Sequence, residues 1–283
     1  LLILDDTMRK SDTARRDAFH AADFAVLCLP DEAAVAAVAM AEGSHVRIID
    51  ASSAHRVAAG WTYGFPEIVG RDVVANARRV SNPGCYPTGF IALLAPLVRA
   101  GLLPADWPYT VHAVSGFSGG GKALIARFAD KPDIAYRAYG LNMGHKHVPE
   151  MKAYAGNLGA GLQHDPLFSP AVVPAYRGMV VEIPLNLAAM QISASADDLR
   201  AALAGFYANS AVVRVITDSV DELLLMDHSA SSDRLDLYVF GAKNSAQVRL
   251  IAMLDNLGKG ASGAAVQSLN LMAGLPETLG LEL

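Results

Sequence analysis

Residues 24–50 run FAVLCLPDEAAVAAVAMAEGSHVRIID and place an alanine-rich helical segment between two short apolar ones. The apolar runs at 24–29 and 46–49 predict strands buried on both faces, and residues 31–41 predict the helix that joins them. Asp31, directly after Pro30, is the predicted N-cap of that helix. A buried strand, a helix and a second buried strand in this order indicate the parallel sheet of a Rossmann-type domain.

The flanking sequence extends this pattern on one side and changes character on the other. Residues 1–4 predict an earlier strand and residues 10–22 a helix, whereas a helix at 88–100 closes the first part of the chain. Beyond it, the predicted strands are 111–114, 180–185, 212–216, 235–240 and 247–254, with helices at 195–208 and 262–273. Runs of strands with segregated helices indicate a second, α+β domain with a mostly antiparallel sheet, and the last helix can return to the first domain.

The composition excludes several classes of protein. The 283 residues carry 23 Lys and Arg against 28 Asp and Glu, and this net charge of -5 gives no sign of a nucleic-acid partner. Apolar runs are far shorter than the roughly 18 residues that span a bilayer, so no membrane segment is expected. Only Cys28 and Cys85 carry thiols, which favours a reducing, cytoplasmic compartment. The sequence begins at Leu1 without a Met, and we expect the native chain to start earlier.

Cys85 lies in the segment SNPGCYP, residues 81–87, just ahead of the predicted helix at 88–100. A thiol at a helix N-terminus faces unpaired N–H groups and the positive end of the helix dipole, and both stabilise its thiolate. The flanking prolines and Gly84 predict a rigid, non-helical turn. A cysteine is more often a small buried hydrophobe, and we keep that interpretation for Cys28 inside its apolar run.

His145 and His147 belong to the segment HKHVPE, residues 145–150. On an extended backbone the two imidazoles share one face, and one can act as the acid/base partner of a thiol, with Glu150 orienting it or binding substrate. A metal site is the alternative, but it needs two further ligands and consumes a nearby thiolate. We therefore expect no metal, and a plain surface pair of histidines is the remaining alternative.

Two further segments carry groups suited to anions. Residues 115–122, SGFSGGGK, form a glycine-rich loop after a predicted strand, where backbone N–H groups can approach phosphate, although the spacing is not that of a P-loop and an ordinary flexible loop is equally compatible. Residues 50–56, DASSAHR, follow another strand at the edge where α/β sheets bind ligands. Arg56 could pair there with a phosphate or a carboxylate.

Taken together, these motifs resemble one family, that of N-acetyl-gamma-glutamyl-phosphate reductases, in its shorter form. The matching segments are SNPGCYPTG at 81–89, SGFSGGGK at 115–122, HKHVPE at 145–150, YGFPE at 63–67 and DNLGKGASGAA at 255–265. The resemblance implies an NADP-binding Rossmann domain at 1–84, completed by the C-terminal helix within 256–283. It also implies a catalytic and dimerisation domain of the glyceraldehyde phosphate dehydrogenase-like type at 85–255.

The resemblance further implies an activity and its residues. It predicts NADPH-dependent reduction of the acyl phosphate N-acetylglutamyl 5-phosphate to the semialdehyde in arginine biosynthesis, by a homo-oligomer, dimer or tetramer. It assigns Cys85 as the nucleophile that forms a thioester, and His145 or His147 as the acid/base. The predicted binding residues are Glu150 and Arg56 for substrate, and Ser115, Gly116 and Asn256 for NADP(H). Arg9 lies where a Rossmann domain would place the 2′-phosphate of NADPH.

One departure and two alternatives remain open. The family's N-terminal Gly-x-x-Gly-x-x-Gly turn has no counterpart in this sequence, which suggests a trimmed or incompletely represented chain. The same residues could act on aminoadipyl or aspartyl phosphate. A non-catalytic nucleotide-binding protein is the other possibility, against which the presence of both the Cys85 and the His-Lys-His motifs argues.

Overall fold

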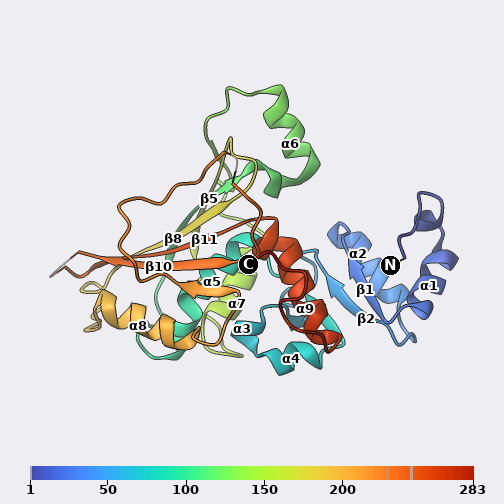
Figure 1. Cartoon of the computed structure of the whole chain (residues 1–283), viewed down its shortest axis with the longest axis horizontal. Helices are drawn as coiled ribbons and strands as arrows, with labels where there is room; N and C mark the ends of the chain where they lie inside the picture. The colour runs from blue at the N-terminus through green and yellow to red at the C-terminus, as the bar shows by residue number, and fades with distance from the viewer. Residues whose placement is uncertain (1, 228, 243–244) are drawn as a thin grey trace. The chain divides into compact units, whose positions relative to one another are not determined.

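The computed structural model describes residues 2–227, 229–242 and 245–283. The chain divides into two compact units (Figure 1). Unit 1 comprises Leu1–Pro83 with Ala265–Leu279, and unit 2 comprises Gly84–Ala264 with Gly280–Leu283.

Unit 1 is built on a parallel sheet with strand order β1-β2-β4-β3. Its strands are β1 (Phe24–Leu27), β2 (Arg47–Asp50), β3 (Thr62–Tyr63) and β4 (Arg79–Ser81). Successive residues of a strand point to opposite faces, and here Ile48 and Ile49 enter two different apolar clusters, each almost fully buried. The sheet is therefore covered on both sides, which confirms the parallel, Rossmann-type sheet predicted from the continuous apolar runs.

Helices cover both faces of this sheet. They are η1 (Met8–Lys10), α1 (Asp12–Ala21), α2 (Asp31–Met40), α3 (Pro66–Val69), α4 (Arg71–Ala75) and α9 (Gly263–Met272). Phe19 of α1 and Val38 of α2 pack with Ile48 on one face. Met272 of α9 packs with Ile49 on the other, although more than 200 residues separate them. The C-terminal helix thus supplies part of the core of unit 1.

Three local predictions for unit 1 are wrong. Residues 2–4 form no strand: Leu2 and Ile3 are exposed, and within the described residues no strand pairs with them. Residue 1 lies outside the described part of the chain. The N-cap of α2 is Pro30 rather than Asp31, whose carboxylate instead accepts hydrogen bonds from the N–H and hydroxyl of Ser53. Strand β1 ends at Leu27, so Cys28 is exposed and not a buried strand residue.

Unit 2 is built on a seven-stranded mixed sheet with order β6-β7-β5-β8-β11-β10-β9. Its strands are β5 (Thr110–Gly116), β6 (Arg137–Ala138), β7 (Leu167–Val173), β8 (Met179–Asn186), β9 (Val213–Val215), β10 (Leu235–Gly241) and β11 (Gln247–Leu254). Among the strand pairs that the structure describes in this sheet, only β5–β7 and β9–β10 are parallel. The second domain therefore has the mostly antiparallel sheet that was predicted.

Helix α5 (Cys85–Arg99) is the centre of unit 2. It packs with α8 (Ala196–Phe206) against the sheet, as Figure 1 shows, and its residues 86–98 are all buried. The helix begins at Cys85, three residues earlier than predicted, because Pro87 occupies its first turn, where a missing N–H costs no intrahelical bond. Gly101, with φ 71°, follows its C-terminus. Cys85 is thus the first residue of the helix rather than part of a preceding turn.

Shorter elements complete unit 2. They are η2 (Phe117–Gly120), α6 (Gly121–Asp130), α7 (Val148–Ala155) and η3 (Gly258–Ser262). In α8 the predicted start is confirmed: Ser195 is the N-cap, and its side chain and that of Asp198 form a reciprocal capping box. Among the described residues, no helix combines the length and apolar character needed to cross a membrane.

Candidate active site

The Cys85 thiol is held at the N-terminus of α5 by a turn that other segments fix in place. Gly84, the N-cap, has extended backbone angles, and its carbonyl accepts hydrogen bonds from both the N–H and the hydroxyl of Thr88. The first N–H groups of a helix have no partner within the helix, and its N-terminus carries a partial positive charge. Cys85 is partly exposed, so this position can present a stabilised thiolate to a ligand.

Glu150 contacts this turn directly. The N–H of Gly84 donates to Glu150 Oε2 at 3.0 Å, and the carboxylate is buried to all but 1% of its surface. Glu150 lies in the first turn of α7, so this bond ties α7 to the start of α5. The structure therefore places Glu150 beside the thiol, in a positioning contact; its predicted contact with substrate stays a prediction.

Gly260 of η3 closes the other side of the thiol. A Cβ on Gly260 would lie 2.9 Å from Cys85 Cβ and 3.0 Å from the carbonyl oxygen of Asp255. Real side chains do not approach so closely, so only glycine fits here. The sequence analysis placed this glycine in a family motif but gave it no role.

His145 and His147 lie together, though not by the predicted geometry. They precede α7 in a turn rather than on an extended segment, and the N–H of His147 donates to His145 Nδ1 at 3.2 Å. This bond brings the ring centroids to 4.7 Å. Because His145 Nδ1 accepts, the neutral ring carries its proton on Nε2. The predicted extended backbone is therefore wrong; the two imidazoles are neighbours because of the turn, and their role as acid/base stays a prediction.

Tyr86 links the thiol to the imidazoles. Its ring centroid lies 5.9 Å from that of His147 and 6.5 Å from that of His145, and its hydroxyl donates to the Ala171 carbonyl at 2.9 Å. Burial raises the pKa of Tyr86 far above its ordinary value, and the neighbouring Tyr139 and Cys85 raise it further. Tyr86 therefore remains a neutral phenol next to Cys85 throughout the physiological pH range.

Tyr139 and Arg137 extend the cluster, and the sequence analysis missed both. The Tyr139 ring lies 5.5 Å from that of His145, and burial raises the pKa of Tyr139, with an opposing effect from Tyr86. Arg137 lies over the Tyr139 ring. Neither residue falls in a recognisable motif; they reach the site because β6 pairs with β7 next to Ala171.

Ser115, Gly116 and Asn256 meet at the ends of β5 and β11. Asn256 donates to Ser118 Oγ at 2.9 Å and accepts the N–H of Gly178 at 2.8 Å. A Cβ on Gly116 would lie 2.7 Å from the Ala175 carbonyl oxygen, so this glycine permits close packing of two backbone segments. The predicted glycine-rich loop is not a loop, since residues 117–130 form η2 and α6. The three predicted cofactor-binding residues are therefore neighbours in unit 2.

Arg56 and Arg9 belong to unit 1. Arg56 is buried, and its Nε donates to the Asn82 carbonyl at 3.1 Å. Arg9 is exposed in η1 and pairs with Asp6 at 2.9 Å, which leaves it able to exchange partners. Ser52, Arg56 and Asn82 follow the carboxyl ends of two parallel strands, the edge at which such sheets bind ligands. The hydroxyl of Ser52 already donates to Asp50 Oδ2 at 2.6 Å, and the predicted contact of Arg56 with substrate stays a prediction.

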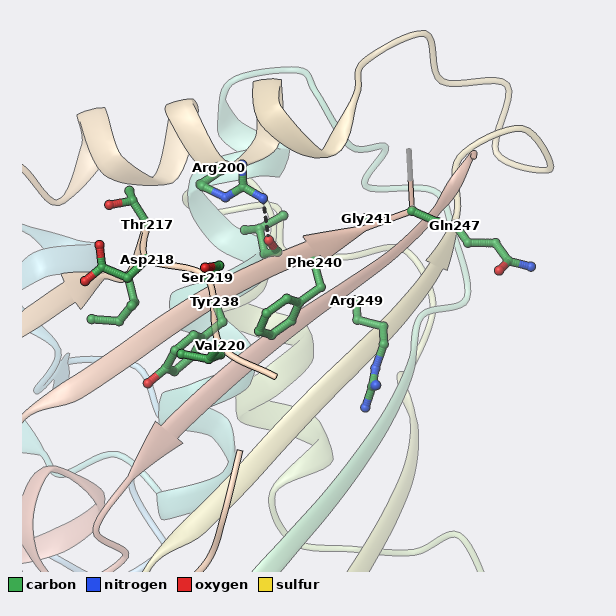
Figure 2. A pocket seen from close by; sticks show the side chains of 13 residues that line it. Arg200, Thr217, Asp218, Ser219, Val220, Tyr238, Phe240, Gly241, Gln247 and Arg249 are labelled. Carbon is green, nitrogen blue, oxygen red and sulfur yellow. Dashed lines mark hydrogen bonds between the residues drawn. The ribbon is translucent and has the colours of Figure 1, made fainter. Parts of the chain in front are cut away.

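A surface hollow in unit 2 offers a different chemistry. It lies over β10 and β11 and is bordered by residues 216–220, with Arg200 and Arg249 at its sides (Figure 2). Tyr238 and Phe240 stack in it at 6.0 Å, and Arg200 donates to the Val239 carbonyl. Its lining contains no thiol or imidazole, so we do not place the reaction there.

Over the described residues, no group of three or more His, Cys, Asp or Glu is arranged to hold a metal.

Comparison with known proteins agrees with this geometry. Residues 5–77 match the family model of the semialdehyde dehydrogenase NAD binding domain, and residues 85–256 that of the semialdehyde dehydrogenase dimerisation domain. The fold resembles the crystal structure of aspartate semialdehyde dehydrogenase II from Vibrio cholerae, with a TM-score of 0.69 at 16% identity, covering 90% of this chain and 81% of that one.

Relatives with higher sequence identity to this chain specify its family more closely. The chain is 44% identical to N-acetyl-gamma-glutamyl-phosphate reductase 2 of a Nostoc species, across 99% of this chain and 91% of that protein. It is 47% identical to N-acetyl-gamma-glutamyl-phosphate reductase of Rhizobium meliloti, across 96% and 90%. With this identity over nearly its whole length and both domain models in order, the chain belongs to the N-acetyl-gamma-glutamyl-phosphate reductase family.

Proposed function

We propose that this chain reduces N-acetylglutamyl 5-phosphate to N-acetylglutamate 5-semialdehyde, with release of phosphate, as a step of arginine biosynthesis. One observation carries the proposal: Cys85 opens the buried helix α5, and both imidazoles lie against the ring of the next residue, Tyr86. A thiol at a helix N-terminus beside an acid/base pair is the arrangement that nucleophilic acyl chemistry requires. The names of relatives that are 44–47% identical specify the acyl phosphate.

In the first step, the Cys85 thiolate attacks the carbonyl carbon of the acyl phosphate. A carbon–sulfur bond forms, and the carbon–oxygen bond to phosphate breaks, which leaves a thioester on Cys85. We assign the first N–H groups of α5, which have no partner within the helix, to stabilise the oxygen that becomes negative in this step. In other enzymes, one such donor contributes on the order of 3 kcal/mol to the transition state.

In the second step, reduction of the thioester, side chains of the protein transfer the protons. NADPH, when bound, supplies the hydride that reduces the thioester carbon. The tetrahedral adduct then collapses to the aldehyde as its carbon–sulfur bond breaks. His145, whose Nε2 carries the proton in the neutral ring, and His147, buried beside it, are the groups that protonate and deprotonate the reacting oxygen and sulfur.

The cofactor and assembly follow from the two domains. Arg9 of unit 1 and Ser115, Gly116 and Asn256 of unit 2 are the residues proposed to contact NADP(H), whereas Arg56 and Glu150 are proposed to bind substrate. The chain carries a semialdehyde dehydrogenase dimerisation domain, which supports a homodimer or a tetramer made of two dimers. A cytoplasmic location stays a prediction that follows from the low thiol content.

The test is the reverse reaction, followed as phosphate-dependent reduction of NADP. We expect N-acetylglutamate semialdehyde to be oxidised far more efficiently than aspartate or aminoadipate semialdehyde, and NADP to be preferred over NAD. Turnover should require added phosphate, since the thioester is released by phosphate attack. A kcat/KM that is equal or higher for aspartate semialdehyde would contradict the proposed substrate.

A further inference from the structure

Arg137 places a guanidinium next to the active-site cluster. It opens β6, an edge strand, and its Cζ lies 4.5 Å from the centroid of the ring of Tyr139, the residue that follows this two-residue strand. Stacking on an aromatic face restricts the guanidinium to one plane and leaves its N–H groups pointing outward along the ring edge. The residue is half-buried, so this orientation is largely fixed.

Among the described residues, no carboxylate forms an ion pair with this cation. Three other arginines of unit 2 do form ion pairs: Arg177 with Asp255, Arg214 with Asp236, and Arg249 with Glu182. Within the part of the chain that the structure describes, Arg137 makes no ion pair and no side-chain hydrogen bond, and its contact is the Tyr139 ring. A half-buried guanidinium with five free donors is a binding site for a carboxylate or phosphate.

Its position relative to the thiol limits which anion can bind. The Tyr139 ring contacts both Arg137 and His145. The charges of two neighbours also act on its hydroxyl: Cys85 raises the pKa of Tyr139, and Arg137 lowers it. The guanidinium is therefore one ring away from the imidazole pair. In the acyl phosphate, the phosphate is bonded to the carbonyl that the thiol attacks, whereas three carbons separate that carbonyl from the other anionic group, the α-carboxylate.

We propose that Arg137 is a specificity-determining residue that binds the α-carboxylate of the acyl substrate. This proposal rests on the proposed function. The planar guanidinium can donate two parallel hydrogen bonds to a carboxylate, and its stacking on the Tyr139 ring keeps it next to the imidazole pair. Acyl substrates without a carboxylate three carbons from the reacting carbonyl should be poor substrates, because they leave the guanidinium partly desolvated and unpaired.

The experiment varies both partners of the contact. Wild type, Arg137→Lys and Arg137→Gln are assayed in the reverse direction with N-acetylglutamate semialdehyde and with its neutral α-amide. We expect Arg137→Gln to lower kcat/KM for the carboxylate substrate about 10- to 100-fold, mostly through KM, because a hydrogen-bonded charge is lost. The α-amide should be a poor substrate for wild type and should lose less than threefold further in the variant. Arg137→Lys should recover part of the loss.

Arg127→Gln is the matched control, since Arg127 is an exposed arginine of α6 and its removal should change neither substrate's kinetics. Equal losses for the acid and the amide would overturn the proposal, because they would mean that Arg137 only packs on Tyr139. A second readout does not need turnover: N-acetylglutamate should slow alkylation of Cys85 in wild type and not in Arg137→Gln. Equal protection of both proteins would also overturn the proposal. If wild type fails to oxidise the semialdehyde but shows this protection, the proposed reaction fails and the carboxylate site stands.

Discussion

The two cysteines allow reactivity to be separated from accessibility. Cys28 is exposed and lies in a loop after β1, whereas Cys85 is only partly exposed but opens α5. The helix dipole favours the thiolate of Cys85. We expect iodoacetamide to modify Cys85 faster than Cys28 below pH 8, the reverse of their exposure, as measured by peptide mapping over time. Cys85→Ser should lower turnover by at least a thousandfold.

Cys28→Ser is the control, and it should turn over substrate and bind NADPH like wild type. The interpretation of Cys28 as a small buried hydrophobe is wrong, because β1 ends one residue before it and the side chain is exposed. The mechanism would be wrong if Cys85→Ser kept its activity, or if alkylation of Cys28 alone stopped turnover. NADPH binding by Cys85→Ser, followed by fluorescence, shows that the variant is folded.

The sequence predicted the residues of the site that lie inside short motifs. Cys85, His145, His147 and Glu150 were all recognisable, since chemistry restricts which residue types stand at those spacings. Arg137 was not, because a single arginine between Tyr136 and Ala138 belongs to no motif and has no local signal of its role. Its position depends on the pairing of β6 with β7, a contact between distant segments that periodicity does not encode.

Helix α5 contains a proline whose cost is offset by another element. Pro96 lies inside the helix and has no N–H, so the carbonyl of Ala92 loses its intrahelical partner. The hydroxyl of Tyr207, at the end of α8, donates to that carbonyl at 2.8 Å. Tyr207→Phe keeps the ring but leaves a buried carbonyl unsatisfied. We expect it to lower the free energy of unfolding by about 1–3 kcal/mol, measured by urea denaturation.

Pro96→Ala supplies a built-in control for this contact. Alanine restores an N–H that can donate to the Ala92 carbonyl, so Tyr207→Phe should cost much less in the Pro96→Ala background. The difference between the two backgrounds isolates the hydrogen bond from the packing of the ring. If Tyr207→Phe cost the same in both, the hydroxyl would not be replacing the missing helix bond.

The types of most elements could be predicted, whereas their ends could not. Ile48 and Ile49 belong to an apolar run that required burial on both faces, so the parallel sheet followed directly. Asp31 is a residue type that is favoured at the N-cap, but its carboxylate instead accepts hydrogen bonds from Ser53. This is a contact between distant segments, which the local sequence does not indicate. Helix α5 began early because a proline that breaks a helix interior is acceptable in a first turn.

The chain passes from unit 1 to unit 2 and then returns, so the core of unit 1 depends on residues that follow unit 2 in the sequence. Met272 of α9 is 4% exposed and packs with Ile49, and the side chain of Arg47 donates to the Met272 carbonyl. Removing this side chain creates a cavity between a strand and a helix from opposite ends of the sequence. The stability of unit 1 should therefore respond to a C-terminal substitution.

We expect Met272→Ala to lower the free energy of unfolding of unit 1 by about 2–5 kcal/mol, because a buried methionine is lost and the cavity collapses only in part. Hydrogen exchange measures this unit by unit: amides of β2 and β4 should exchange faster in the variant, while those of β5 and β8 in unit 2 should keep their wild-type rates. Leu275→Ala is the matched control, since Leu275 lies in the same returning segment but is 47% exposed, and it should change neither set of amides. Unchanged exchange in β2 and β4 would mean that α9 does not contribute to the core of unit 1, whereas faster exchange in both units would mean that the two unfold as one cooperative body.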